Sequence, residues 1–313
     1  MINLKRQLAE AGVMGVNRRN AEYTLKYNSR NRYPLVDDKL RTKTLALKAG
    51  IAVPELYGVI RTEYEARNLA QRVECYPDFV IKPSRGSGGS GILVISGRSK
   101  EMYRKVDGVL MNRDEVEYHL FNVISGLYSL GGQPDKALIE YRVKFDPVFE
   151  AISYEGVPDI RVIVFLGVPV MCMVRLPTRM SGGKANLHQG AIGAGIDIAS
   201  GKTLTAVWKD NIVSEHPDTG NPVSGIKIPN WENLLKIAAR CNALTGLGYI
   251  GVDLVLDKAK GPLILEMNAR PGLNIQIANR AGLLPRLKLV ERHNRDLLSI
   301  EDRIAFSRKH FSA

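Results

Sequence analysis

The most informative stretch of this 313-residue sequence is ILEMNARPG at residues 264–272, which follows GVDLV at residues 251–255. Side chains alternate between the two faces of a strand, so Glu266 and Asn268 project from one face. Asp253 lies in the other apolar segment, and a hairpin would bring the three side chains together. Carboxylate and amide oxygens are the ligands that magnesium prefers. Acidic residues in apolar strands are costly unless a metal or a cation offsets them, so the pattern predicts a magnesium site.

A second motif joins two apolar segments, residues 79–83 and 92–95, through a glycine-rich turn. Lys82 inside the first segment must either extend to solvent or meet an anion. Taken alone, a lysine on an edge strand is the more ordinary explanation. Glycines leave backbone N–H groups accessible, which suits phosphate oxygens. No GK[ST] ends the turn and no helix follows it, so it is neither a Walker motif nor a dinucleotide fingerprint. We expect a hairpin loop that covers phosphates.

A third group of charged residues lies in the apolar segments 159–166 and 168–175. Asp159 and Arg161 are two positions apart and share a face, and a hairpin turning at Gly167 would place Arg175 on the neighbouring strand. Two arginines facing one cleft suit phosphate or carboxylate. A solvent-facing charged surface is the alternative, and it is favoured when these residues are considered alone.

Composition narrows the class of protein. The chain is 45% hydrophobic and 24% charged, which is typical of globular domains. Its three cysteines lie far apart with no CxxC pair, which argues against a zinc site or a disulfide framework. We find neither a signal peptide nor an apolar window long enough to span a bilayer, and we expect a cytoplasmic protein.

The formal net charge of +12 is concentrated near the N-terminus. Residues 1–48 hold eleven Lys and Arg against four Asp and Glu. Such a basic arm suits nucleic acid, an anionic membrane surface or acidic small molecules, and a solvated basic helix explains it equally well. No aromatic-rich stacking segment accompanies it, which argues against a dedicated single-strand reader. We do not expect nucleic acid as a partner.

The hydrophobic pattern predicts an alternation of helices and strands. We expect helices over 3–31, 37–49, 62–73, 113–128, 231–245 and from 284 onward. We expect strands over 79–83, 92–95, 137–143, 159–166, 168–175, 190–197, 204–208, 251–256 and 263–268.

The order of these motifs resembles the ATP-grasp superfamily, and its RimK-type α-L-glutamate ligases and glutamate ligase-like relatives in particular. The resemblance covers residues 36–280. It rests on Lys39, Lys82 with its glycine loop, Glu140-Tyr141, Asp159-Ile160-Arg161, Lys184-Ala185-Asn186, Asp253 and Glu266-x-Asn268. The implied fold is α+β, with two subdomains gripping ATP between them. The implied boundaries are a basic helical arm over 1–35, subdomains over 36–138 and 139–280, and a helical tail over 281–313.

The resemblance also implies roles for individual residues. Asp253, Glu266 and Asn268 would ligate two magnesium ions, with Mn²⁺ as an alternative. Arg161 and Arg175 would steady the transferred phosphate and an acyl-phosphate. The residues implied in nucleotide binding are Lys39, Lys82, Arg85, Gly86, Ser87, Gly88, Gly89, Gly91, Glu140, Tyr141, Asp159, Lys184 and Asn186.

The sequence departs from the RimK pattern near its start. RimK-type ligases carry about 100 residues before the first motif lysine, and here 38 precede Lys39. Lys184 stands where the pattern usually has arginine, which keeps the charge but loses the bidentate grip. The block at residues 15–20, GVNRRN, has no RimK counterpart, and we expect it either to replace a lid or to bind an acidic substrate.

The implied reaction joins a small-molecule or peptide carboxylate to an amine through an acyl-phosphate, with release of ADP. Glutamate or a similar amino acid is the expected added group. Two alternatives stay open: a small-molecule kinase on the same fold, and an ATP-regulated protein that binds nucleic acid or a membrane surface through the basic arm. His188 is only a weak candidate for a general base, and homo-oligomerisation is left open.

Overall fold

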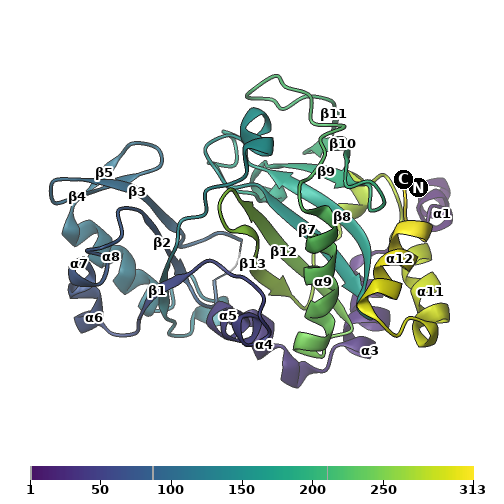
Figure 1. The fold of residues 1–313 in the computed structure, drawn as a ribbon, viewed down its shortest axis with the longest axis horizontal. Coiled ribbons are helices and arrows are strands. Elements are labelled where there is room, and N and C mark those ends of the chain that lie inside the picture. Colours follow the sequence, from purple (N-terminus) through teal and green to yellow (C-terminus); the bar gives the residue numbers. More distant parts are fainter. Residues whose placement is uncertain (1, 87, 210) are drawn as a thin grey trace. The chain divides into compact units, whose positions relative to one another are not determined.

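A computed structural model describes residues 2–86, 88–209 and 211–313. The chain forms two compact units, each built on an antiparallel sheet (Figure 1). The smaller unit comprises Asp38–Arg41 and Val53–Lys144, and the larger unit comprises the segment up to Asp37, Thr42–Ala52 and Phe145–Ala313. None of the described helices is long and apolar enough to cross a membrane.

The smaller unit is a six-stranded sheet with three helices. Its strand order is β1-β6-β2-β3-β4-β5. The strands are β1 (Leu56–Ile60), β2 (Phe79–Pro83), β3 (Leu93–Ser99), β4 (Met102–Lys105), β5 (Leu110–Met111) and β6 (Ala137–Glu140). The helices are α6 (Glu63–Arg67), α7 (Leu69–Arg72) and α8 (Arg113–Ile124). Their buried apolar side chains form one core with those of the sheet, including Leu69, Phe79, Ile81, Leu120 and Ile139.

Local signals in the sequence explain where two of these helices begin and end. Thr62 and Asn112 each form a capping box with the glutamate three residues later, at the start of α6 and α8. We expected α8 to run to Tyr128, but it ends at Ile124. Gly126 turns the chain there with a φ of 91°, and its missing side chain leaves room for the carbonyl of Gln133.

The larger unit is a seven-stranded sheet in the order β11-β10-β9-β8-β7-β12-β13. Its strands are β7 (Asp159–Phe165), β8 (Val168–Leu176), β9 (Ile192–Ile196), β10 (Thr203–Trp208), β11 (Asn211–Val213), β12 (Tyr249–Asp257) and β13 (Gly261–Asn268). Helices α9 (Trp231–Thr245) and α12 (Ile300–His310) pack together and on the sheet, as Figure 1 shows. Helix α10 (Ile275–Ala278) contacts β8, β9 and β10, and α11 (Leu284–His293) contacts β8.

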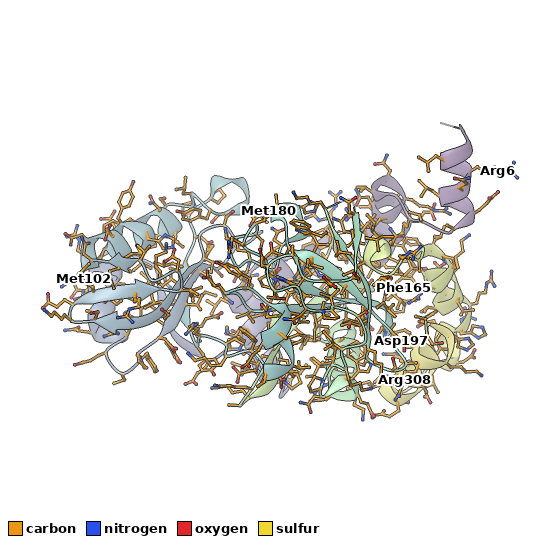
Figure 2. The ribbon with its side chains drawn as sticks, turned by 90° about the horizontal axis from the view of Figure 1, so that it is seen from above. Arg6, Met102, Phe165, Met180, Asp197 and Arg308 are labelled. Carbon is orange, nitrogen blue, oxygen red and sulfur yellow. The ribbon has the colours of Figure 1, made fainter. Side chains whose placement is uncertain are left out.

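The N-terminal segment is helical but broken, which corrects the continuous helix that we expected over residues 3–31. It comprises α1 (Ile2–Glu10), α2 (Val16–Arg18), a π-helical turn (Arg19–Thr24), α3 (Leu25–Tyr27), a 3₁₀ turn (Arg30–Arg32) and α4 (Pro34–Asp37). Gly12, with a φ of 70°, ends the first helix. Arg6 of α1 points away from the rest of the unit, whereas Phe165 lies among packed side chains (Figure 2). Tyr23 and Tyr27 of the segment meet Phe165 edge to face.

All nine expected strands are present, and α9 has the expected bounds. Strand β6 stops at Glu140 rather than Val143, and the helix expected over 37–49 is split at Asp38 into α4 and α5 (Lys39–Lys48). The carboxylate of Asp38 accepts the N–H groups of Leu40 and Arg41, which starts a new helix at this point. The sequence did not predict β1, β4, β5 and β11, which are short and largely lack fully buried residues.

Candidate functional site

The hairpin of β12 and β13 brings together the three residues of the expected metal site. Asp253 lies directly opposite Glu266, and Gly251 lies opposite Asn268. The Nδ2 atom of Asn268 is 3.4 Å from a carboxylate oxygen of Asp253 and 3.4 Å from one of Glu266. The convergence expected from the period of two is therefore confirmed.

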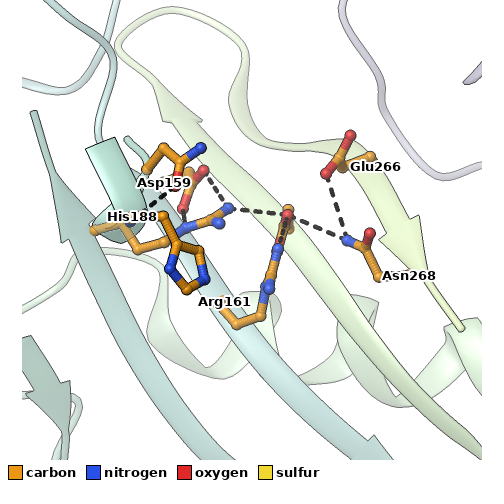
Figure 3. A network of polar contacts seen from close by, with 8 residues as sticks. Asp159, Arg161, His188, Glu266 and Asn268 are labelled. Carbon is orange, nitrogen blue, oxygen red and sulfur yellow. Dashed lines mark hydrogen bonds and ion pairs between the residues drawn. The ribbon is translucent and has the colours of Figure 1, made fainter. Parts of the chain in front are cut away.

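The two arginines on β7 and β8 bind the carboxylates of the same face (Figure 3). Asp253 lies opposite Arg161 across β12 and β7, and the Arg161 guanidinium binds both of its oxygens. Arg175 lies opposite Asp159 across β7 and β8 and binds both Asp159 oxygens. Its Nη2 also donates to Asp253 at 2.9 Å. Two guanidinium groups and two carboxylates therefore form one connected set, which we call the charge network.

The charge network is buried, so the alternative of a solvent-facing charged surface is wrong. The side chains of Arg161 and Asp253 are 9% and 1% exposed. Burial raises the pKa of Asp253, but Arg161 and Arg175 more than offset this and hold it well below its usual range. Burial also raises the pKa of Asp159, and there it outweighs the lowering by Arg175. Inside an apolar sheet such charges persist only when paired, as they are here.

The donor set fits a divalent cation, with one qualification from the geometry. Asp253, Glu266 and Asn268 offer carboxylate and amide oxygens, and the amide of Asn268 can present either its oxygen or its nitrogen to the carboxylates. Both oxygens of Asp253 already accept bonds from arginine, so a metal ion at Asp253 would use the lone pairs that the two guanidinium groups leave free. Over the described residues, no group of three or more His, Cys, Asp and Glu is arranged to hold a metal ion.

The loop before β9 carries the residues of the Lys184-Asn186 motif. Asn186 accepts the N–H of His188 and so starts the short 3₁₀ turn Leu187–Gln189. Lys184 is exposed, and its N–H donates to the carbonyl of Ser181. Figure 3 draws His188 in the same close-up as Asp159 and Arg161. The hydrogen bonds described for this loop lie within the loop itself.

In the smaller unit, Lys82 meets an anion. It lies on β2, between β6 and β3, and its ammonium forms a buried ion pair with Glu140 of β6. The edge-strand explanation is therefore wrong. The Glu140 carboxylate offsets the cost of burying this ammonium and fixes its position.

The base of the glycine loop is tied to the start of α5. Lys39 Nζ donates to the carbonyl of Gly86 at 2.6 Å, and the N–H of Lys39 donates to the carbonyl of Ser84 at 2.8 Å. The Ser84 hydroxyl donates to Asp38 at 2.6 Å. Lys39 of α5 and Gly86 of the loop, both implied in nucleotide binding, are thus directly hydrogen-bonded.

The rest of the loop has the backbone geometry of a glycine-rich turn. Gly88, Gly89 and Gly91 have φ values of 64°, 79° and 74°. A side chain at Gly91 would overlap the ring of Tyr128, 2.5 Å away. Ser87, also expected to contact phosphate, lies outside the described residues. The N–H of Arg85 donates to Asp135 at 2.8 Å.

The Glu140-Tyr141 hinge is engaged within its own unit. The N–H of Tyr141 donates to the carbonyl of Glu55 at 2.8 Å, and Glu140 is paired with Lys82. In this structure the Tyr141 amide is therefore not presented to a nucleotide.

Sequence reasoning missed three buried residues that position these loops. Asp38 and Asp135 hold the base of the glycine loop. His216, fully buried, donates from Nε2 to the carbonyl of Pro177 at 2.9 Å and accepts the N–H of Asp218 at Nδ1. The hydrogen bonds that matter here join residues distant in sequence. The sequence therefore offered one signal for these three residues, namely a polar side chain within a turn.

Comparison with known proteins places the chain in a family. Residues 18–292 match the family described as "Sugar-transfer associated ATP-grasp". No curated protein matches the sequence.

Several solved ATP-grasp enzymes are distantly similar. The ATP-grasp ligase PsnB with its minimal precursor is 14% identical, with a TM-score of 0.47 over 89% of this chain and 62% of that chain. A Chryseobacterium gregarium RiPP-associated ATP-grasp ligase is 13% identical, with a TM-score of 0.47 over 87% of this chain and 63% of that one. D-alanine–D-alanine ligase from Bacillus anthracis is 15% identical, with a TM-score of 0.45 over 89% and 68%. This chain thus spans less than two thirds of the length of the first two, and likeness at this level indicates no substrate.

Proposed function

Because the chain belongs to the sugar-transfer associated ATP-grasp family, we propose that it is an ATP- and magnesium-dependent ligase that joins a carboxylate to an amine. The observation that carries the proposal is the charge network beside Glu266 and Asn268. It sets two arginines and an acidic donor set on one face of a buried sheet. Such a face suits the negative charge that develops when a phosphoryl group moves to a carboxylate.

The reaction that we propose has two steps. The substrate carboxylate attacks the γ-phosphoryl group of ATP and releases ADP, which leaves an acyl-phosphate. The amine then attacks the acyl carbon and expels phosphate, and the product is an amide. Phosphoryl transfer asks the protein mainly for positioning and charge neutralisation.

Arg161 and Arg175 would supply that neutralisation in the larger unit. Their guanidinium groups are held in place by Asp253 and Asp159, so they are oriented before a substrate arrives. In the smaller unit, Lys82 and Lys39 would contact the nucleotide phosphates. Glu140 fixes Lys82, and the Gly86 carbonyl fixes Lys39.

Asp253, Glu266 and Asn268 would hold magnesium, as one ion or two, with Mn²⁺ as an alternative. When bound, the metal neutralises charge on the ATP phosphates. The exposed Lys184, together with Asn186, is proposed to meet phosphate from the loop before β9. For the amine substrate we propose glutamate or a similar amino acid, on the RimK-type resemblance of the motifs.

The proposal is tested by an ADP-release screen over pairs of carboxylic acids and amines, with the product mass measured directly. Amine-dependent ADP release with a condensed product supports ligation. ADP release without any amine, ending in a stable phosphoester, would instead show a kinase.

Two variants test whether the activity depends on the proposed site. Glu266→Gln and Lys82→Ala should each lower turnover at least 100-fold, the scale on which loss of an electrostatic contact to a transition state acts. Glu301→Gln, an exposed residue on α12, is the matched control and should retain activity. Full turnover in Glu266→Gln would exclude the site proposed here.

A further inference from the structure

Two reciprocal pairs of hydrogen bonds, among other contacts, hold the basic N-terminal segment in the larger unit. Met14 donates its N–H to Gln276 Oε1 at 2.8 Å and accepts from Gln276 Nε2 at 3.0 Å. Asn28 donates to the carbonyl of Tyr249 at 2.6 Å and accepts the Tyr249 N–H at 2.9 Å. The residues between these points, including the GVNRRN block, therefore hold a defined place beside β12 and the turn after β13.

Arg19, within this block, reaches the turn that follows the expected metal ligands. Its Nη1 donates to the carbonyl of Pro271 at 2.9 Å. Its Nε and Nη2 donate to Asn20 Oδ1 at 3.1 and 2.8 Å, and the side chain is half-buried. The neighbouring Arg270 stacks on the ring of Tyr33 at 5.2 Å.

These two arginines have neutral partners. Over the part of the chain that the structure describes, no carboxylate lies within ion-pair distance of Arg19 or Arg270. Burial and the positive charge of Arg270 both lower the pKa of Arg19. Arg270 is exposed, so solvent screens part of the repulsion between the two cations, and a bound anion would offset the rest.

A buried hydroxyl near Arg19 also lacks a hydrogen-bond partner among the described residues. The phenol oxygen of Tyr249 is fully buried, and no described residue hydrogen-bonds to it. Burial raises the pKa of Tyr249, while the positive charges of Arg19 and Arg161 act in the opposite direction. This hydroxyl is therefore within electrostatic reach of Arg19 and Arg161.

Pro271 connects Arg19 to the charge network. A side chain built at Gly251 would come within 2.7 Å of Pro271 Cβ and 3.5 Å of Arg161 Cδ. Gly251 thus lets Pro271 pack on the sheet beside the stem of Arg161. The carbonyl of the same Pro271 accepts the hydrogen bond from Arg19. Pro271 therefore lies between Arg19 and Arg161.

We propose that Arg19 and Arg270 bind a carboxylate of the substrate other than the one that ATP activates. The enzyme's acid or amine substrate would accordingly carry a second, free carboxylate, as dicarboxylic acids and amino acids do. The inference rests on the proposed function, whose activated carboxylate would lie at the charge network. An arginine fork matches the two oxygens of a carboxylate, and it also matches a phosphate, so the experiment includes both.

The experiment is calorimetric titration of the whole protein, without nucleotide, with the dicarboxylates from malonate to adipate and with inorganic phosphate. We expect at least one dicarboxylate to bind, and to bind at least tenfold more weakly to Arg19→Ala and Arg270→Ala. Arg19→Lys should lose affinity as well, because lysine keeps the charge without the fork. Arg18→Ala is the matched control: Arg18 is exposed and pairs with Glu22 at 2.9 Å, so its removal should leave affinity unchanged.

Three results would overturn the inference: no dicarboxylate binds the wild type, Arg19→Ala and wild type bind equally, or inorganic phosphate binds most tightly and depends on Arg19. None of them requires turnover. Failure of ligation in the ADP-release screen would therefore reject the proposed function separately from this subsite. The circular dichroism spectrum of Arg19→Ala shows whether this variant is folded. If Arg19→Ala is unfolded, the dicarboxylate affinity of Arg19→Lys decides the outcome instead.

Discussion

Lys82 and Glu140 form an ion pair between neighbouring strands of the smaller unit, and both side chains are more than nine-tenths buried. The pair joins two residues implied in nucleotide binding, so one contact serves both the stability of the sheet and the position of a cation. Removing one partner from such a pair leaves an uncompensated buried charge. Stability and activity can therefore be separated by the choice of variant.

Lys82→Met should lower the free energy of unfolding by about 3–5 kcal/mol, because the Glu140 carboxylate stays buried without this cation. The double variant Lys82→Met, Glu140→Gln should recover most of that stability while remaining inactive. Urea unfolding together with ADP release measures both effects. Lys105→Met is the control: Lys105 pairs with the exposed Asp107 at 2.7 Å, and its loss should cost less than about 1 kcal/mol. A double variant as unstable as Lys82→Met would contradict the pairing argument.

His119 should make the smaller unit sensitive to acid. Burial lowers the pKa of His119 below its ordinary value of 6.5, and its Nε2 donates to the carbonyl of Gly91 in the glycine loop. The folded state therefore prefers neutral His119, and its contribution to stability is complete above pH 6.5. As the pH falls below 6.5 the unfolded chain binds more protons, so the free energy of unfolding decreases.

His119→Gln keeps a hydrogen-bond donor but cannot titrate, so part of this pH dependence should disappear. Thermal unfolding of both proteins between pH 8 and pH 5 is the measurement. The difference in Tm between wild type and His119→Gln at pH 8 is the reference against which their differences at lower pH are compared. Parallel curves over the whole range would show that His119 does not contribute.

The strand alternation in the sequence was enough to predict which residues share a face, but not which partners they bind. A period of two places Glu266 on the same strand face as Asn268, and Asp159 on the same strand face as Arg161. That Arg161 binds Asp253 depends on the register of β7 against β12, which pairs residues far apart in sequence. No local pattern contains that information.

The same limit applies to the N-terminal segment, which the sequence presents as a basic helical arm. Its charge is visible in composition, whereas its place depends on contacts such as Met14 with Gln276, 262 residues away. The missed strands have a different cause. Strand β4 is only four residues long with one buried residue, Tyr103, so it lacks a period of alternation.

Gly251→Ala should disturb the turn that links the proposed metal ligands to Arg19. The new methyl group would lie 2.7 Å from Pro271 Cβ, so Pro271 must shift. We expect a loss of about 1–3 kcal/mol in unfolding free energy, typical of overpacking, and weaker binding of the dicarboxylate. Gly272→Ala, at a glycine with no atom within 4 Å of the added group, should have little effect on stability. Equal unfolding midpoints for the two variants would contradict this packing argument.

Asp253 and Glu266 should differ in what their removal costs, although both are proposed to bind metal. Asp253 is buried and accepts bonds from Arg161 and Arg175, whereas Glu266 is half-buried. Asp253→Asn leaves two buried guanidinium groups with one carboxylate, so it should destabilise the protein by about 3–5 kcal/mol as well as abolish turnover. Glu266→Gln should abolish turnover with less than about 1 kcal/mol of destabilisation, in the range of substitutions away from buried pairs. Urea unfolding of both variants without nucleotide or metal makes the comparison, because stabilisation by ligand is then absent. If Asp253→Asn were as stable as Glu266→Gln, Asp253 would not be the residue that holds the charge network together.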